Sequence, residues 1–189
     1  MAHGRPMVGK VMDFLTAIQT GIARTLDFQG RSRRSEFWWF TLFSMLVVMV
    51  AITLDRTLGL PALGVMPEGG LPETYQQSLF WVFRVGTHPI ETLAGLLLFI
   101  PLYSLMVRRL HDTGRSGYWA LLFYGLNFVS GPTVARMMVA VEAEDMSMFN
   151  DMTVIVILMV NVAASLLYLV FMIKDSDKAP NQYGPSPKA

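Results

Sequence analysis

The chain has 189 residues, of which 53% are hydrophobic and only 15% charged, whereas about a quarter of the residues in a soluble domain are charged. This composition excludes a disordered polymer and a nucleic-acid-binding protein, and it argues against an ordinary soluble enzyme. The mean hydropathy of +0.44 favours a protein of the lipid bilayer. Because the chain contains no cysteine, disulfides and cysteine-ligated metal sites are excluded.

Residues 1–27 are interpreted as an extension that precedes the membrane domain. Apolar residues recur in it at three- and four-residue spacing, as on one face of a helix: Val11, Leu15, Ile18, Ile22 and Leu26. We expect this amphipathic helix to lie flat on the cytoplasmic membrane surface before the first span. Packing against a partner helix or against the bundle is the plainer alternative.

Residues 28–189 are predicted to form an all-α, integral-membrane four-helix bundle. The predicted spans are residues 37–54, 90–107, 118–138 and 153–173, followed by a short tail at 174–189. The third span is the least regular, since the apolar run from Tyr118 to Ser130 covers only about 20 Å as a helix. We expect it to continue through Gly131 and Pro132 as a bent helix; a re-entrant segment that dips in and returns is the alternative. Asn127 and Asn161 are expected to make interhelical hydrogen bonds.

The distribution of lysine and arginine predicts the orientation. Twelve of the fifteen lie in the segment before the first span, the link between spans two and three, and the tail, which share one side in a four-span arrangement. The other three are Arg56, Arg84 and Arg136. The positive-inside rule then predicts that both termini of a multi-pass membrane protein lie in the cytoplasm.

Three polar motifs fall on this predicted cytoplasmic side: FQGRSRRSEFWWF at residues 28–40, VRRLHDTGRSGYW at residues 107–119, and the tail KDSDKAPNQYGPSPKA. In the first motif, Ser32 or Ser35 is expected to cap the following helix, with Glu36 in its first turn. With these motifs in this order, the chain from about Phe28 onward resembles the YhaH-like bacterial inner-membrane family known as domain of unknown function 805. The resemblance implies a small multi-span membrane protein of unestablished biochemical role. The motif residues assigned a structural role are Gly30, Trp38, Gly114, Gly117, Trp119, Asn181, Tyr183, Gly184 and Pro185.

The charged residues of the motifs are hypothesised to form one polar cluster at the cytoplasmic mouth of the bundle. Its expected members are Arg31, Arg34, Glu36, Arg109, His111, Asp112 and Arg115. The cluster could hold an anionic lipid headgroup or another ligand, or it could be a purely structural ion-pair network. Adjacent His111 and Asp112 suggest a general base or metal ligand, but no nucleophile or second ligand stands at suitable spacing. We therefore expect Asp112 to cap the third span or to pair with an arginine of the first motif.

These observations predict a non-enzymatic structural or interaction subunit, without catalytic residues, bound metal or cofactor. Its expected partners are membrane lipids with anionic headgroups, further copies of the chain or other membrane proteins, and not nucleic acid. A small transporter or channel component is the first alternative, with Glu91 and Asn161 as the residues to test. An enzyme acting on lipid headgroups through His111 and Asp112 is the second.

Overall fold

The computed structural model describes residues 12–60, 88–142 and 150–187. The helices are α1 (Phe14–Ala23), α2 (Arg34–Thr57), α4 (Pro89–Asp112), α5 (Tyr118–Glu142) and α6 (Met152–Ile173). Apart from one isolated β-bridge between Asn181 and Gly184, helices are the regular secondary structure of the described residues. The predicted all-α class is therefore confirmed.

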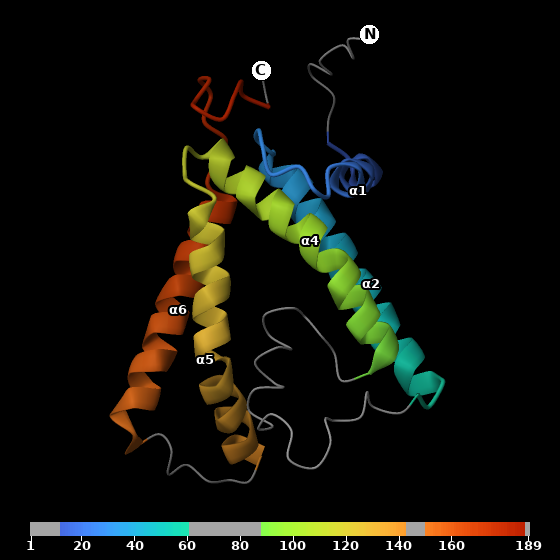
Figure 1. Ribbon diagram of the computed structural model, residues 1–189, viewed down its shortest axis with the longest axis vertical. Coiled ribbons are helices and arrows are strands. Elements are labelled where there is room, and N and C mark those ends of the chain that lie inside the picture. Colours follow the sequence, from blue (N-terminus) through green and yellow to red (C-terminus); the bar gives the residue numbers. More distant parts are fainter. Residues whose placement is uncertain (1–11, 61–87, 143–149, 188–189) are drawn as a thin grey trace.

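The four long helices form two antiparallel pairs, α2 with α4 and α5 with α6. The pairs meet at the end where α2 begins and α4 and α6 end, and they diverge toward the other end (Figure 1). We call the meeting point the motif end, since all three polar motifs lie there. The apolar core is concentrated toward it and comprises Phe37, Phe40, Leu98, Leu102, Leu105, Met106, Val107, Leu110, Ala120, Phe123, Phe171 and Met172.

Three of these helices, α2, α4 and α6, are long and apolar enough to cross a bilayer. At the position of the third predicted span, α5 runs for 25 residues without a break through Gly131 and Pro132, in agreement with continuation rather than re-entry. At 1.5 Å per residue it is about 37 Å long. That α5 makes a fourth crossing remains a prediction.

The amphipathic extension is helical over ten residues, with Asp13 capping the first turn by accepting a hydrogen bond from Thr16 N at 2.7 Å. α1 packs on α2 through a small-residue face, because Ala17 and Gly21 are buried there. The predicted apolar stripe faces elsewhere: Leu15 is 68% exposed and Ile22 is 56% exposed. Leu26 lies beyond the end of α1, and Val11 lies outside the described residues.

At the opposite end of the pair α2/α4, a buried carboxylate joins the two helices. Asp55, 1% exposed, accepts hydrogen bonds from the backbone N–H groups of Ile90 (3.1 Å) and Glu91 (2.8 Å). These N–H groups belong to the first turn of α4 and have no partner within that helix. A side chain of α2 thus supplies the N-terminal cap of α4 and fixes the register between the two helices.

The pair α5/α6 is joined by one of the two expected asparagines. Ser130 Oγ donates to Asn161 Oδ1 at 2.9 Å, which confirms an interhelical hydrogen bond at Asn161. The prediction for Asn127 is wrong in this respect, since its side-chain amide donates to Phe123 O in its own helix. The side-chain amide of an asparagine can donate to a carbonyl of its own helix when no acceptor on the neighbouring helix lies opposite.

Candidate functional site

The site at the motif end is built around Arg31, which lies just before α2. Its Nε donates to Asp112 Oδ1 at 3.0 Å, and its two Nη groups donate to the carbonyl oxygens of Asp112, Asp177, Ala179 and Gly184 at 2.5 to 3.2 Å. A guanidinium has five N–H donors, and five contacts are present here. Arg31 therefore joins the first motif, the end of α4 and the tail through one buried side chain.

Arg109 occupies the other side of the same carboxylate. Its Nη1 lies 2.5 Å from Asp112 Oδ2, and its Nε donates to Met172 O at 3.3 Å. Its Nη2 donates to Lys174 O. Arg109 and Asp112 are both fully buried. Two guanidinium groups thus enclose one carboxylate. The remaining donors of Arg109 make hydrogen bonds to carbonyl oxygens at the end of α6, which have no partner within the helix.

A third buried arginine, Arg108, was not expected to be part of the site. It donates to Arg24 O and Asp27 O, both at 2.8 Å, and to Ser32 Oγ at 3.2 Å. Its Nη2 faces Glu36 Oε1 across 3.8 Å, an ion pair longer than a direct hydrogen bond. Arg108 therefore fixes the link between α1 and α2 onto α4.

The start of α2 differs from the expectation that Ser32 or Ser35 would cap it. The N-cap residue is Arg33, and no side-chain hydrogen bond caps the helix. Ser32 instead uses its hydroxyl and its backbone N–H for Arg108. The expected position of Glu36 in the first turn is confirmed.

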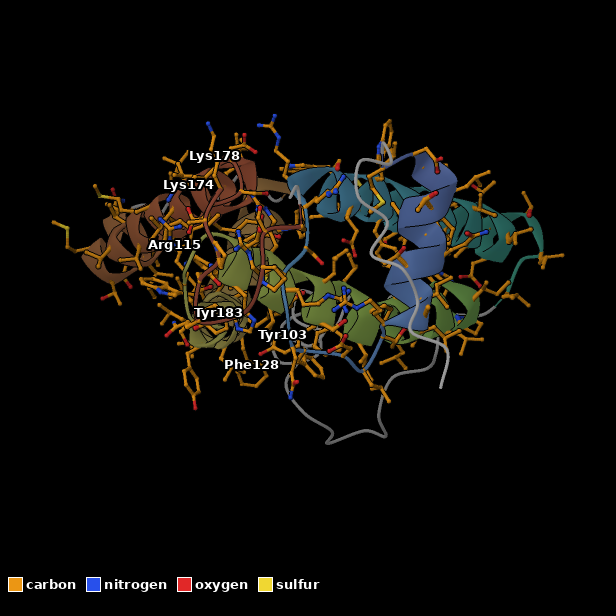
Figure 2. The ribbon with its side chains drawn as sticks, turned by 90° about the horizontal axis from the view of Figure 1, so that it is seen from above. Tyr103, Arg115, Phe128, Lys174, Lys178 and Tyr183 are labelled. Carbon is orange, nitrogen blue, oxygen red and sulfur yellow. The ribbon has the colours of Figure 1, made fainter. Side chains whose placement is uncertain are left out.

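His111 is held by the other two motifs. Its Nδ1 lies 3.2 Å from Gly30 O, its ring stacks on the Tyr183 ring with centroids 3.8 Å apart and planes 5° apart, and its carbonyl accepts from Asn181 Nδ2 at 3.0 Å. His111 and Asp112 are neighbours in sequence, but they interact with different partners. The tail therefore docks on α4 through Asn181 and Tyr183. Seen from above, Tyr183, Lys174 and Lys178 lie over this end of the helices (Figure 2).

Two glycines of the second motif explain how α4 turns into α5. Gly114 has φ +72°, a left-handed conformation that favours glycine after a helix end. At Gly117 a Cβ atom would lie 2.8 Å from Val107 Cγ1, so only glycine lets the start of α5 approach α4 this closely. Trp119 then packs edge-on against Phe171, with ring centroids 5.3 Å apart.

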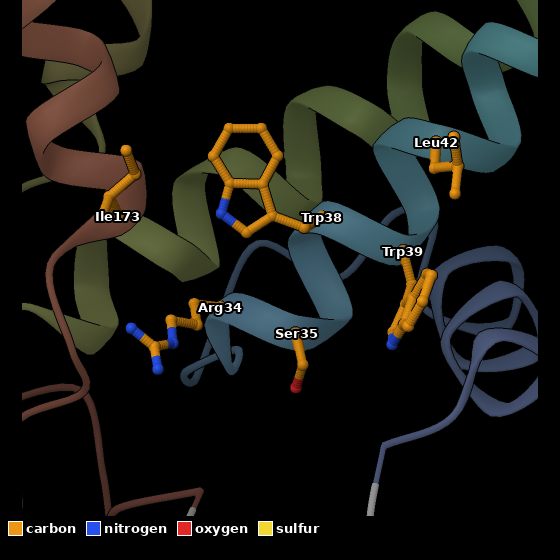
Figure 3. A pocket seen from close by; sticks show the side chains of 6 residues that line it. All are labelled: Arg34, Ser35, Trp38, Trp39, Leu42 and Ile173. Carbon is orange, nitrogen blue, oxygen red and sulfur yellow. The ribbon is translucent and has the colours of Figure 1, made fainter.

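The remaining two arginines of the hypothesised cluster lie outside this network. The guanidinium of Arg115 covers the Phe171 ring at 4.0 Å. Arg34 is exposed and lines a hollow of about 510 Å³ between α2 and α6 (Figure 3). The structure thus brings Arg31, Arg109 and Asp112 into direct contact and places His111 beside them, whereas Glu36 pairs with Arg108.

Asp112 pairs with an arginine of the first motif, as expected. Both its carboxylate oxygens accept from arginines, and at the start of α5 it is Ser116 Oγ that accepts from Tyr118 N. Within the described ranges, no group of three or more His, Asp or Glu side chains is placed to hold a metal ion. Arg31, Arg109 and Asp112 make ion pairs and hydrogen bonds with other residues of the chain. Arg108 was detectable as a basic residue at the predicted end of a span, but two of its three hydrogen-bond acceptors are backbone carbonyls, which leave no signal in the sequence.

These features define a helical integral membrane protein whose helices are joined at one end by buried arginines. Residues 25–185 match the family described as "Protein of unknown function (DUF805)", and the chain belongs to that family. It is similar to inner membrane protein YhaH of Escherichia coli strain K12, with 35% identity over 98 residues, which cover 52% of this chain and 64% of YhaH. It is also similar to YhaI of the same organism, with 37% identity over 99 residues, covering 52% of this chain and 63% of YhaI.

The chain thus spans somewhat less than two thirds of the length of these relatives. No solved structure matches it. The family and the relatives' names agree with the resemblance read from the three motifs, and they identify relatives of the bacterial inner membrane without an assigned activity.

Proposed function

We propose that the protein is a four-span inner-membrane protein with cytoplasmic termini, and that it acts as a non-enzymatic structural or interaction subunit. The observation that supports this proposal most directly is the use of Arg31. All five of its donors have acceptors within the chain, on Asp112 and on the tail. A buried arginine used in this way stabilises a defined surface instead of presenting a free charge to a substrate.

The environment of His111 and Asp112 supports a non-enzymatic role. The carboxylate of Asp112 lies between two guanidinium groups and is fully buried. The imidazole of His111 is stacked on Tyr183 and directed to Gly30 O. A general acid–base pair needs both groups within reach of one substrate atom, and these two groups point to different neighbours.

The charge distribution supports cytoplasmic placement of the motif end. The arginines and lysines of the three motifs that the structure describes gather there, whereas Arg56 lies at the opposite end of α2. In this orientation the docked tail forms a platform at the cytoplasmic membrane surface. Its exposed residues, such as Lys178, would contact anionic lipid headgroups or a partner protein.

Single-cysteine labelling tests the orientation, and the chain is well suited to it because it has no cysteine of its own. With a membrane-impermeant thiol reagent on spheroplasts, Arg56→Cys should be labelled and Lys178→Cys should be protected until the membrane is opened. Labelling of Lys178→Cys in closed spheroplasts would overturn the proposed orientation.

Affinity purification in mild detergent, followed by mass spectrometry of proteins and lipids, tests the interaction role. A protein or anionic lipid should co-purify, and Lys178→Glu should reduce its yield while the matched charge reversal Arg56→Glu leaves it unchanged. Two results would overturn the proposal: turnover of a lipid substrate lost in His111→Gln, or solute flux in liposomes lost in Asn161→Ala.

A further inference from the structure

The arginines of the motif end differ in what they contact. Arg31, Arg108 and Arg109 are buried and donate to protein acceptors. Arg33 donates to Pro187 O, and Arg115 covers Phe171. Arg34 forms no hydrogen bond or ion pair with another described residue, and its side chain is exposed. It is thus a cation of the first motif whose charge the described part of the chain leaves available.

Arg34 lies at one end of the hollow between α2 and α6. The other lining residues are Ser35, Trp38, Trp39, Leu42 and Ile173. Figure 3 shows Trp38 extending toward Ile173, with Arg34 and Ser35 at the end where α2 begins. The hollow therefore has a polar end and an apolar wall.

The length of the hollow matches the boundary region of a bilayer. Leu42 follows Arg34 by eight positions, which is about 12 Å along a helix. The apolar side chains of the wall stay accessible, with 38% exposure at Trp38, 41% at Leu42 and 49% at Ile173. Tryptophan favours the membrane interface, and its ring spans the headgroup and upper acyl region. A ligand with a charged headgroup and an acyl chain fits a hollow that has a polar end and an apolar wall.

Electrostatics favour a negative head at this place. Arg34 lies close enough to the buried Arg109 for their two positive charges to repel each other. Asp112 is already shared between Arg31 and Arg109. The charge of Asp175 offsets part of this repulsion at Arg109, and an anion beside Arg34 would offset it from the side of Arg34.

We propose that this hollow binds one anionic glycerophospholipid. The phosphate lies on the Arg34 guanidinium with the Ser35 hydroxyl as a second donor, and the acyl chains follow Trp38, Leu42 and Ile173 between α2 and α6. The site deepens the proposed function, on which it rests for the membrane surface that supplies the lipid. It also gives Arg34 a role distinct from that of the buried arginines.

Native mass spectrometry of the full chain in neutral detergent tests this site, with phosphatidylglycerol as probe and phosphatidylcholine as zwitterionic comparison. One bound phosphatidylglycerol should be retained over phosphatidylcholine. Arg34→Gln should weaken its binding about fivefold, the factor that corresponds to about 1 kcal/mol for one cation at an anionic surface. The matched variant Arg56→Gln removes the same charge from the opposite end of α2 and should leave binding within a factor of two.

Two further variants separate charge from shape. Arg34→Lys should restore most of the anionic preference, because the charge is kept. Trp38→Ala should weaken phosphatidylglycerol and phosphatidylcholine together, because it removes part of the acyl wall. Equal losses in Arg34→Gln and Arg56→Gln would overturn the site, since general surface charge would then explain binding. Displacement of the lipid by millimolar inorganic phosphate would overturn the lipid assignment in favour of a soluble anion.

The outcome is separable from that of the proposed function. If cysteine labelling places the motif end outside the cytoplasm while Arg34→Gln still lowers phosphatidylglycerol binding selectively, the orientation fails and the lipid site stands. If labelling agrees with the orientation and Arg34→Gln has no selective effect, the lipid site fails alone. Equal thermal unfolding of the wild type and Arg34→Gln provides the control for folding.

Discussion

Arg31 and Asp112 are 81 residues apart in the sequence and form a buried ion pair of 3.0 Å, with side-chain exposures of 1% and 0%. Arg109 completes the pair as a triad by approaching the second carboxylate oxygen. Because the remaining arginine donors end on carbonyl groups of the tail and of α6, the triad connects the segment before α2, the end of α4, the end of α6 and the tail. The carboxylate of Asp112 is the negative charge that both arginines of the triad share.

Asp112→Asn should therefore be strongly destabilising. Removing one member of a buried ionic group leaves the other charges uncompensated, which costs about 3–5 kcal/mol. Thermal or denaturant unfolding in detergent should show the loss. Asp177→Asn is the matched control, because Asp177 pairs with Lys174 at 3.9 Å on the surface and such pairs contribute about 0–1 kcal/mol. Equal effects of the two variants would contradict the structural role of the triad.

Tyr183→Ala should loosen the docking of the tail on α4, which Arg31 and Asn181 still hold. The variant removes the stacked ring beside His111, and aromatic pairs contribute about 0.5–1.5 kcal/mol beyond their buried area. Limited proteolysis should cleave the tail faster in Tyr183→Ala than in the wild type. Tyr183→Phe keeps the ring and should behave as the wild type; rapid cleavage of this variant would show that stacking is not what holds the tail.

Gly21→Ala should disturb the packing of α1 on α2. An added Cβ would lie 2.3 Å from Cδ2 of Phe40, and Phe40 is fully buried in the core. Overpacking of this kind costs about 1–3 kcal/mol, measurable by unfolding in detergent. Gly125→Ala is the control, because nothing lies within 4 Å of its added Cβ. If the two glycine variants are equally stable, α1 does not pack on α2 in this way.

Asp55→Ala should weaken the junction of α2 and α4 at the end opposite the motifs. The change leaves the N–H groups of Ile90 and Glu91 without their acceptors, and loss of an N-cap costs about 1–2 kcal/mol. Asp55→Asn keeps one acceptor oxygen and should lose less. Hydrogen exchange of the first turn of α4 provides a local measurement. Unchanged exchange in Asp55→Ala would contradict the capping role.

The link between α1 and α2 should loosen in acid through Asp27. Partial burial acts to raise the pKa of Asp27, but hydrogen bonds from Arg24 and Gln29 N and the charges of Arg24 and Arg108 outweigh it, so the pKa lies below its ordinary value of 3.8. A lowered pKa means that the carboxylate stabilises the folded chain above pH about 3.8, and that this contribution disappears as the pH falls through the lower folded-state pKa. Asp27→Asn should remove this part of the acid dependence from unfolding curves measured down to pH 2. If Asp27→Asn and the wild type lose stability equally as the pH falls to 2, Asp27 does not contribute to the acid dependence.

Helix positions followed from the sequence because length and apolar composition are local properties. The predicted spans at 37–54 and 153–173 correspond to α2 and α6 with ends within three residues. The end of α4 lies further along than the predicted span, at Asp112 instead of residue 107. The additional turn carries the polar residues Arg108, Arg109 and Asp112, which a hydropathy criterion excludes although their buried partners let the helix continue.

The grouping of the three motifs also followed from the sequence, since an even number of crossings brings alternate links to one side. The sequence did not distinguish the arginines from one another. Arg108 and Arg109 are adjacent, yet successive residues on a helix are turned by about 100°. Arg108 therefore reaches the link before α2, whereas Arg109 reaches the end of α6.

The amino-acid sequence by itself determined that the chain is helical, apolar and related to an inner-membrane family, because composition and motif spacing are carried by the chain alone. Only the tertiary structure decided which arginines are buried and paired within the protein, and that Arg34 stays at the surface beside Trp38. The physical reason is that, beside Asp112, most acceptors of the buried arginines are backbone carbonyls of distant segments. Every residue has a backbone carbonyl, so the pattern of side chains in the sequence does not predict which carbonyls will accept hydrogen bonds from these arginines.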